Sequence, residues 1–223
     1  MKITEKGPLI RGVSSWMEAE LYLNPQKISV YNLAQNADIC HSGLALPEQI
    51  HGNKVQYIHS PGEFSEVDGL VTKTSDVTLI LKVADCVPIF LFDPAINMIG
   101  LVHSGWRGTA NGIVSNAIKT FLDKGSKVKD IHLFLGHSIC QNCYAVDKEV
   151  AEHFSHQVKT LHQNGKWLVG LQGEIILQSL AEGVKITNIT TSSVCSFEDL
   201  ACHSYRRDGK DAGRMVAIMR ILS

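Results

Sequence analysis

Two apolar runs joined by a short turn constrain the fold more than any other feature of this chain. Residues 87–92 and 98–103 are rich in β-branched and aliphatic side chains, which is typical of buried strands. Between them, Asp93 followed by Pro94 suits the first two positions of a type I turn. The pattern predicts an antiparallel hairpin, and a sheet that contains it cannot be purely parallel.

Predicted strands and helices alternate along the rest of the chain. Strands are predicted at 55–58, 77–83, 131–135, 185–190 and 215–221, and helices at 113–122 (with Gly125 as the stop), 147–154 and 172–182. The first 50 residues lack a sustained period and are expected to be irregular. We therefore expect an α+β or α/β fold, a single domain over residues 1–223 in which a mixed sheet is flanked by helices.

Composition excludes several classes of protein. Lysine and arginine number 21 against 22 acidic residues, so there is no basic excess to neutralise a nucleic acid. No run approaches the roughly 20 apolar residues that span a membrane, so no membrane partner is expected. The first residues carry scattered charges and no apolar stretch of a signal peptide, which favours a cytoplasmic protein with reduced cysteines.

The hairpin brings a thiol and an imidazole together. Counting outward from a turn centred near residue 95 pairs Cys86 with His103 at one edge of the sheet. A thiolate and an imidazole at that separation fit two ligands of a zinc or copper ion, or a Cys–His nucleophile pair. A buried cysteine beside a partly buried histidine is the alternative without function.

The neighbours of this pair favour a functional site. Asp85 precedes the thiol, and an acid at the mouth of an apolar strand is costly without a compensating group. Trp106 offers an aromatic face, and Arg107 is expected at the N-terminus of the helix that contains Ile113, where an anion would bind.

A catalytic zinc ion usually has three protein ligands and one open position, so a third ligand is needed. His51 is the best candidate because it lies at a glycine-containing turn before a predicted strand. Three other histidines, His41, His59 and His137, remain alternatives.

Cys140 and Cys143 form a C-x-x-C spacing. Because no second pair stands nearby in the sequence to complete a four-ligand zinc site, a structural or incidental role is favoured for these two cysteines.

Several segments together resemble the bacterial YfiH-type family, long called laccase-domain or multicopper-polyphenol-oxidase-like proteins. In chain order they read QIHGN (49–53), DGLVT (68–72), ADCVP (84–88), VHSGWRG (102–108), LGHSI (135–139), YAV (144–146), SYRRDG (204–209) and GR (213–214). Any one of these segments alone would be weak, but their common order is highly specific.

The resemblance implies a zinc-dependent purine nucleoside enzyme with His51, Cys86 and His103 as metal ligands. Its implied reactions are phosphorolysis of adenosine, inosine, guanosine and methylthioadenosine, and deamination of adenosine. Copper is less suited, because three mixed ligands around one ion do not make the several copper centres that oxygen reduction needs.

Within that frame, Cys86, His103 and Asp85 are expected to be catalytic, with Asp85 as the group that transfers protons. Arg107, Arg206 and Arg207 are expected to bind phosphate. A metal-free Cys–His hydrolase, a copper-dependent polyphenol oxidase and a non-catalytic binding module are the alternatives.

Overall fold

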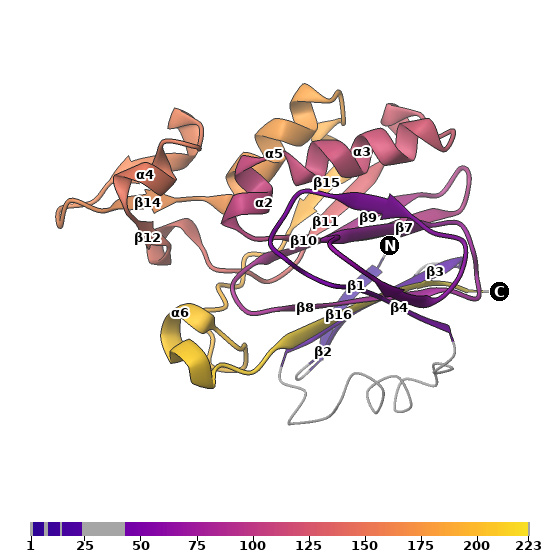
Figure 1. Cartoon of the computed structure of the whole chain (residues 1–223), viewed down its shortest axis with the longest axis horizontal. Helices are drawn as coiled ribbons and strands as arrows, with labels where there is room; N and C mark the ends of the chain where they lie inside the picture. Colours follow the sequence, from indigo (N-terminus) through magenta and orange to yellow (C-terminus); the bar gives the residue numbers. More distant parts are fainter. Residues whose placement is uncertain (1, 7–8, 14, 24–42, 223) are drawn as a thin grey trace.

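The computed structural model describes residues 2–6, 9–13, 15–23 and 43–222. Within them, two mixed β-sheets and a layer of helices are stacked, with helices on one side, one sheet in the middle and the other sheet beneath (Figure 1). None of the helices in these ranges is long and apolar enough to cross a membrane.

The outer sheet contains strands from both ends of the chain. Its order is β1 (Lys2–Lys6), β2 (Leu9–Val13), β3 (Met17–Tyr22), β16 (Met215–Ile221), β8 (Thr78–Val83), β4 (Leu44–Pro47) and β6 (Gly62–Phe64). Pairing is antiparallel from β1 to β8 and parallel from β8 through β4 to β6. The last strand of the chain thus lies in the middle of this sheet.

The middle sheet holds the hairpin. Its order is β15 (Ile189–Thr191), β11 (His132–Leu135), β9 (Val87–Asp93), β10 (Met98–Ser104), β7 (Gly69–Thr72) and β5 (Val55–Tyr57). A small third sheet joins β12 (Ala145–Val146), β14 (Trp167–Val169) and β13 (Lys159–Leu161).

Most of the helices cover the outer face of the middle sheet or line the site, and one packs on the small third sheet. The α-helices are α2 (Trp106–Ala110), α3 (Ile113–Asp123), α4 (Lys148–Ala151), α5 (Leu171–Ala181) and α6 (Tyr205–Asp208). Short 3-10 turns lie at Val128–Asp130, Gln141–Cys143, His156–Val158, Ile186–Asn188 and Gly209–Asp211.

Strand β9 is buried on both faces because it lies between the two other layers. Ile89 and Leu91 pack toward α3, where Phe121 is fully buried. Phe90, on the opposite face, packs between the sheets with Leu79 of β8. Alternate side chains of a strand point to opposite faces, so a continuously apolar run is what this position requires.

The expected mixed architecture is confirmed, and most predicted elements are found. The hairpin, the strands at β8, β11 and β16, and helices α3 and α5 lie within a residue or two of their predicted bounds. Gly125 follows α3 with a φ of 97°, a left-handed conformation that suits a helix stop.

Three expectations were wrong. The first 50 residues are not irregular, since they contain β1 to β4, although residues 24–42 lie outside the described part. The helix predicted from 147 to 154 is only one turn, α4, followed by further turns. The strand predicted at 185–190 is a 3-10 turn followed by β15. Short amphipathic segments do not distinguish one turn of helix from a bend.

Candidate metal and substrate site

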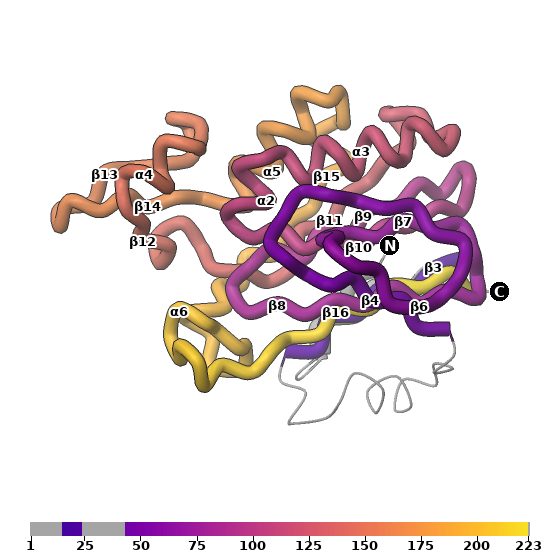
Figure 2. Tube along the Cα trace, viewed as in Figure 1, coloured from indigo at the N-terminus to yellow at the C-terminus, as the bar shows by residue number. Residues whose placement is uncertain are grey.

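The chain crosses from one sheet to the other at the candidate site. Strand β8 of the outer sheet ends at Val83 and β9 of the middle sheet begins at Val87, so residues 84–86 bridge the two layers (Figure 2). Asp85 has a φ of 81°, which is uncommon for a residue other than glycine and marks a strained turn. The crossover places Cys86 at the end of the sheet, where its thiol is accessible to a pocket.

The hairpin register differs by two residues from the count made on the sequence. His103 pairs with Pro88, and Ser104 pairs with Val87, so Cys86 is a diagonal neighbour of His103 instead of its direct partner. The turn is centred between residues 95 and 96, whereas a direct pairing of Cys86 with His103 requires a centre between residues 94 and 95. Diagonal neighbours share a face of the sheet, so the two side chains still meet.

The lack of a side chain at Gly105 leaves space for the thiol of Cys86 and the imidazole of His51. A Cβ at this position would lie 3.0 Å from Sγ of Cys86 and 3.1 Å from Cδ2 of His51. Any larger residue would therefore push into the thiol and the imidazole.

His51 reaches the site from the loop after β4, and a buried carboxylate shapes that loop. Asp68 accepts hydrogen bonds from the backbone N–H groups of Ile50 (3.3 Å), His51 (2.9 Å) and Gly52 (2.7 Å). The φ of His51 is 61°, a left-handed conformation that these bonds hold in place.

Asp68 also orients a second ligand. Its Oδ1 lies 2.8 Å from Nδ1 of His103, and neither side chain is more than 3% exposed. This bond leaves Nε2 of His103 free to face the thiol, as in many carboxylate–histidine–zinc arrangements. No local pattern in the sequence indicates this role of Asp68, although its segment DGLVT (68–72) is one of those that carry the family resemblance.

The three expected ligands converge. One donor atom from each of His51, Cys86 and His103 lies within 4.8 Å of the others, and the two imidazole rings meet edge to face with centroids 4.7 Å apart. The other histidine candidates lie elsewhere: His59 is exposed against Tyr57, and His137 is buried and bonded to Ser192. His41 lies outside the described residues.

The electrostatics of the cluster favour a charged pair. Burial raises the pKa of the Cys86 thiol, but hydrogen bonds and charge from His103 and His51 outweigh it and bring the pKa down to about 7. Burial lowers the pKa of His103, but its bonds to Asp68 and Cys86 outweigh it and raise that pKa to about 9. Near neutral pH the metal-free site is therefore close to a thiolate beside an imidazolium.

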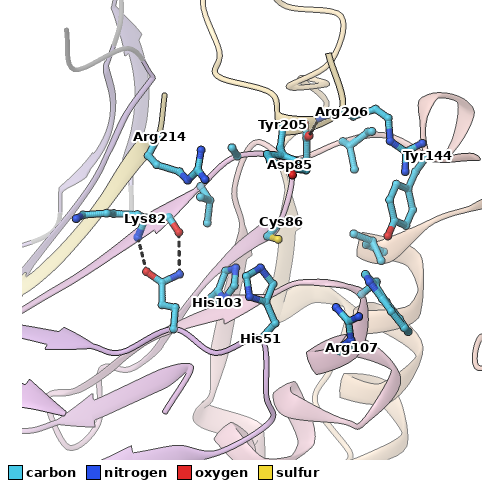
Figure 3. Close-up of a pocket in the computed structure, with 16 residues that line it drawn as sticks. His51, Lys82, Asp85, Cys86, His103, Arg107, Tyr144, Tyr205, Arg206 and Arg214 are labelled. Carbon is cyan, nitrogen blue, oxygen red and sulfur yellow. Dashed lines mark hydrogen bonds between the residues drawn. The ribbon is translucent and has the colours of Figure 1, made fainter. Parts of the chain in front are cut away.

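A cavity of about 740 Å³ opens above the three ligands. It is large enough for a nucleoside-sized molecule. Figure 3 shows Cys86, His51 and His103 at its centre, with Lys82 and Arg214 on one side and Arg107, Arg206 and Tyr144 on the other. The remaining lining residues are Gln49, Val83, Ala84, Asp85, Trp106, Ile139, Leu171 and Tyr205.

Four cationic side chains and one carboxylate line this cavity, and the carboxylate is already engaged. Asp85 accepts hydrogen bonds from Oγ of Ser196 at 2.7 Å and from the backbone N–H of Arg206 at 2.6 Å. The cavity wall is thus suited to an anionic ligand.

The three predicted phosphate-binding arginines have different surroundings. Arg107 is exposed over the ring of Trp106, with Cζ 4.4 Å from the ring centroid. Arg206 lies over Tyr144 and donates one N–H to the carbonyl of Ala145.

Arg207 is not brought to the cavity. Its guanidinium donates to the carbonyl oxygens of Ser196, Phe197, Asp199 and Cys202 and to the carboxylate of Asp208. It therefore braces the 196–208 segment. The sequence could not separate it from its neighbour Arg206, since both stand in the same short motif.

Arg107 also departs from its expected place. It lies inside α2, a separate five-residue helix, and Gly112 with a φ of 71° divides α2 from α3. The expected anion site at the N-terminus of the helix containing Ile113 was therefore wrong, and only the side chain of Arg107 faces the cavity.

The fold and this site define a class of protein: two mixed sheets with flanking helices and a two-histidine, one-cysteine cluster at the point where the chain changes sheet. Residues 27–222 match the family model described as multi-copper polyphenol oxidoreductase laccase. The chain belongs to this family, which is the YfiH-type family that the sequence motifs resemble.

Named relatives are similar over most of their length. A purine nucleoside phosphorylase of Deinococcus radiodurans is 35% identical over 177 residues, covering 77% of this chain and 67% of the relative. Adenosine deaminase RL5, from an unknown prokaryotic organism, is 30% identical over 200 residues, covering 82% and 76%. The crystal structure of YlmD from Geobacillus stearothermophilus has a TM-score of 0.90 at 26% identity, covering 99% and 98%.

Proposed function

We propose that this protein is a zinc-dependent purine nucleoside enzyme that catalyses phosphorolysis of purine nucleosides and deamination of adenosine. The observation that carries the proposal is the cluster of His51, Cys86 and His103, oriented by Asp68, at the centre of a cation-lined cavity. The names of the relatives, a phosphorylase and a deaminase, support the same chemistry. The five described cysteines are free thiols, which supports the cytoplasm as its compartment.

The donor set fits zinc. Two imidazoles and one thiolate match the three-ligand pattern of catalytic zinc sites, which keep a further position for water or substrate. The carboxylate of Asp68 behind His103 is the outer partner that such sites commonly have. When bound, the zinc ion would act as a Lewis acid toward an oxygen of the reacting molecule. The cluster provides one mononuclear site and does not suit four-electron oxygen reduction by several coppers.

In phosphorolysis a phosphate oxygen bonds to C1′ while the bond between C1′ and N9 breaks. The purine leaves with the electron pair of that bond and takes up the proton that the hydrogen phosphate loses, and the other product is ribose 1-phosphate. The side chain of Arg107, already fixed over Trp106, is proposed to hold the phosphate through its planar fork of N–H groups. Arg206 keeps N–H groups beyond the one that it donates to Ala145, and is proposed to contact the same anion.

Aromatic residues at the same end of the cavity are proposed to hold the purine. Tyr144 and Trp106 both line the wall there. Burial raises the pKa of Tyr144 to about 12, so its hydroxyl stays protonated at neutral pH and can donate to a ring nitrogen or to O6 of the base.

Asp85 is proposed as a positioning residue more than as a proton carrier. Both of its carboxylate oxygens accept hydrogen bonds from the 196–206 segment, and its backbone carbonyl accepts one from the N–H of Ile139. It therefore holds three parts of the cavity wall around Cys86. For it to transfer a proton in deamination, one of these bonds would have to open.

One observation favours a second candidate function. The thiol pKa of about 7 and the imidazole pKa of about 9 are those of an ion pair like the one in cysteine hydrolases, with Asp68 in the orienting position. A metal-free Cys–His hydrolase remains the alternative on this ground.

The experiment that tests the proposal compares metal-free and zinc-loaded protein. Inosine and phosphate, or adenosine alone, would be supplied, and released hypoxanthine or inosine measured. We expect turnover that requires zinc and is lost in Cys86→Ala together with metal at this site. Full turnover by metal-free protein, or no turnover of any purine nucleoside by loaded protein, would contradict the proposal.

A further inference from the structure

A second group of potential metal ligands lies behind the cavity wall. The sulfur atoms of Cys140, Cys143 and Cys195 and a carboxylate oxygen of Glu198 all lie within 4.8 Å of one another. Each pair of ligands is separated by two residues, C-x-x-C in one segment and C-x-x-E in the other. The second pair is 52 positions from the first, so the sequence spacing alone concealed the set.

The fold brings the two segments together through backbone pairing. Ser138 and Cys195 form a parallel β-bridge, in which the N–H of Ser196 donates to the carbonyl of Ser138 at 3.0 Å. The backbone N–H of Cys140 points at Sγ of Cys195, 3.3 Å away. Two chain segments are thus fixed side by side with their thiols facing each other.

Each segment then turns so that its second ligand faces the first. The 3-10 turn Gln141–Cys143 brings the N–H of Cys143 within 3.1 Å of the carbonyl of Cys140. In the other segment the N–H of Asp199 donates to the carbonyl of Cys195 at 2.9 Å, which places Glu198 on the inside of the turn. Sγ of Cys143 lies 3.3 Å from Oε1 of Glu198, which closes the group.

Two tight turns that each present two ligands are the usual construction of a structural zinc site. With Zn–S bonds of about 2.3 Å, the sulfur atoms of a tetrahedral site lie about 3.8 Å apart, so ligands within 4.8 Å need only a small contraction. Soft thiolates select zinc over magnesium or calcium. We propose that Cys140, Cys143, Cys195 and Glu198 bind a second zinc ion, distinct from the one proposed at Cys86.

This site would be structural because the protein supplies all four ligands. The location of the second site, beside the cavity wall, indicates what a zinc ion there would stabilise. Ile139 and Tyr144, which flank the first pair of cysteines, line the cavity, and Ser196, next to Cys195, donates to Asp85. A zinc ion here would lock the 138–144 segment to the 195–206 segment and so hold this wall of the cavity in place.

The first test is the zinc content of purified protein and of three variants, measured by mass spectrometry of the metal after exhaustive dialysis. We expect about two zinc ions per chain in the wild type and in Cys202→Ala, a buried cysteine of the same region whose thiol is outside the group. Cys143→Ala and Cys86→Ala should each retain about one.

The outcomes separate this inference from the proposed function. One zinc ion per chain that survives Cys143→Ala and is lost in Cys86→Ala would overturn the second site and leave the first. One zinc ion that survives Cys86→Ala and is lost in Cys143→Ala would do the reverse.

A second measurement needs no variant and so does not depend on whether Cys143→Ala folds. Wild-type protein would be denatured in chelator without reductant and alkylated, and the mass of the protein and of its peptides would be measured by mass spectrometry. We expect all six cysteines to be alkylated. Two unmodified cysteines located at 140, 143 or 195 would show a disulfide in place of the metal.

Cobalt substitution gives a positive signature of the second site. We expect a strong thiolate-to-cobalt absorption that persists in Cys86→Ala, and its loss in that variant would count against the second site.

Discussion

His103 and Asp68 form a buried hydrogen bond of 2.8 Å between Nδ1 and Oδ1, and the same carboxylate accepts the backbone N–H of His51. One acid therefore orients two of the three proposed ligands. Burial raises the pKa of Asp68, but the hydrogen bond from His103 and those from Gly52 and His51 outweigh it, so the carboxyl is held below its usual range. It stays ionised at neutral pH.

Replacing Asp68 with asparagine keeps the size of the side chain but removes the charge. We expect zinc affinity at the Cys86 site to fall by about 10- to 100-fold, because outer partners of this kind make a ligating histidine more basic and fix its orientation. Competition with a chromophoric chelator would measure it.

Asp93→Asn is the matched control. Asp93 is equally buried and also bonds to a backbone N–H, that of Ala95, but it lies at the far end of β9 from Cys86. Both variants should lose stability, and only Asp68→Asn should lose zinc affinity. Equal affinity in the two variants would show that Asp68 is not linked to the metal.

Gly105→Ala tests how tightly the cluster is packed. The backbone at Gly105 has a φ of −77°, which alanine adopts freely, so a loss would come from the side chain and not from the turn. The new methyl group would lie 3.0 Å from Sγ of Cys86 and displace it. We expect weaker zinc binding and at least a tenfold loss of activity.

The thermal midpoint of the metal-free Gly105→Ala protein should change by only a few degrees. If zinc affinity were unchanged instead, the thiol would not be held where the structure has it.

Much of this molecule could be predicted from local pattern. The strands of the middle layer are long apolar runs, and α3 has a clear helical stripe, so these elements are found close to where the sequence puts them. Cys86 and His103 could be paired because one short turn joins their strands. The error of two residues in register shows the limit of such counting, since turn geometry decides it.

What could not be predicted depends on contacts between distant segments. The role of Asp68 comes from three backbone N–H groups 16 to 18 positions away and from His103, 35 positions away. Arg207 differs from Arg206 only because the 196–202 carbonyls surround it. Cys195 and Glu198 also could not be grouped with Cys140 and Cys143 from the sequence. The β-bridge that brings the two segments together has no periodic pattern that predicts it.

Arg107→Lys separates phosphate binding from general damage. Lysine keeps the charge but loses the planar fork and the stacking on Trp106. We expect KM for phosphate to rise about tenfold or more, with KM for the nucleoside changing less than threefold. Steady-state kinetics with each substrate varied in turn would measure both.

Arg207→Lys is the contrasting variant. It should lower the thermal midpoint, because four backbone carbonyls lose their partner, while leaving KM for phosphate in the folded protein nearly unchanged. If both variants raised KM for phosphate alike, Arg107 would have no special role.

The pH dependence of the site follows from opposite shifts in the pKa values of Cys86 and His103. The pKa of His103 is raised to about 9, so its contribution to metal-free stability is complete below its ordinary value of 6.5 and is lost as pH rises through 9. The pKa of Cys86 is lowered to about 7, so its contribution is present above its ordinary value of 9.0 and is lost as pH falls through 7. Between about 7 and 9 both groups are charged, and the metal-free pair is strongest there.

Zinc binding must displace the protons that His103 and Cys86 carry in the metal-free protein. Binding of zinc at the Cys86 site should release about one proton between pH 7 and 9, from His103, and more below pH 7, where Cys86 is also protonated. Zinc affinity and activity should therefore fall on the acid side, and excess zinc should partly restore the turnover of inosine near pH 6.

In a metal-free Cys–His hydrolase, acid would also reduce activity, but added zinc would inhibit the enzyme by binding the thiolate. A zinc titration at that pH, on protein first shown to be metal-free, distinguishes the two: restoration supports the metalloenzyme, and inhibition throughout by protein that is active without metal would exclude it.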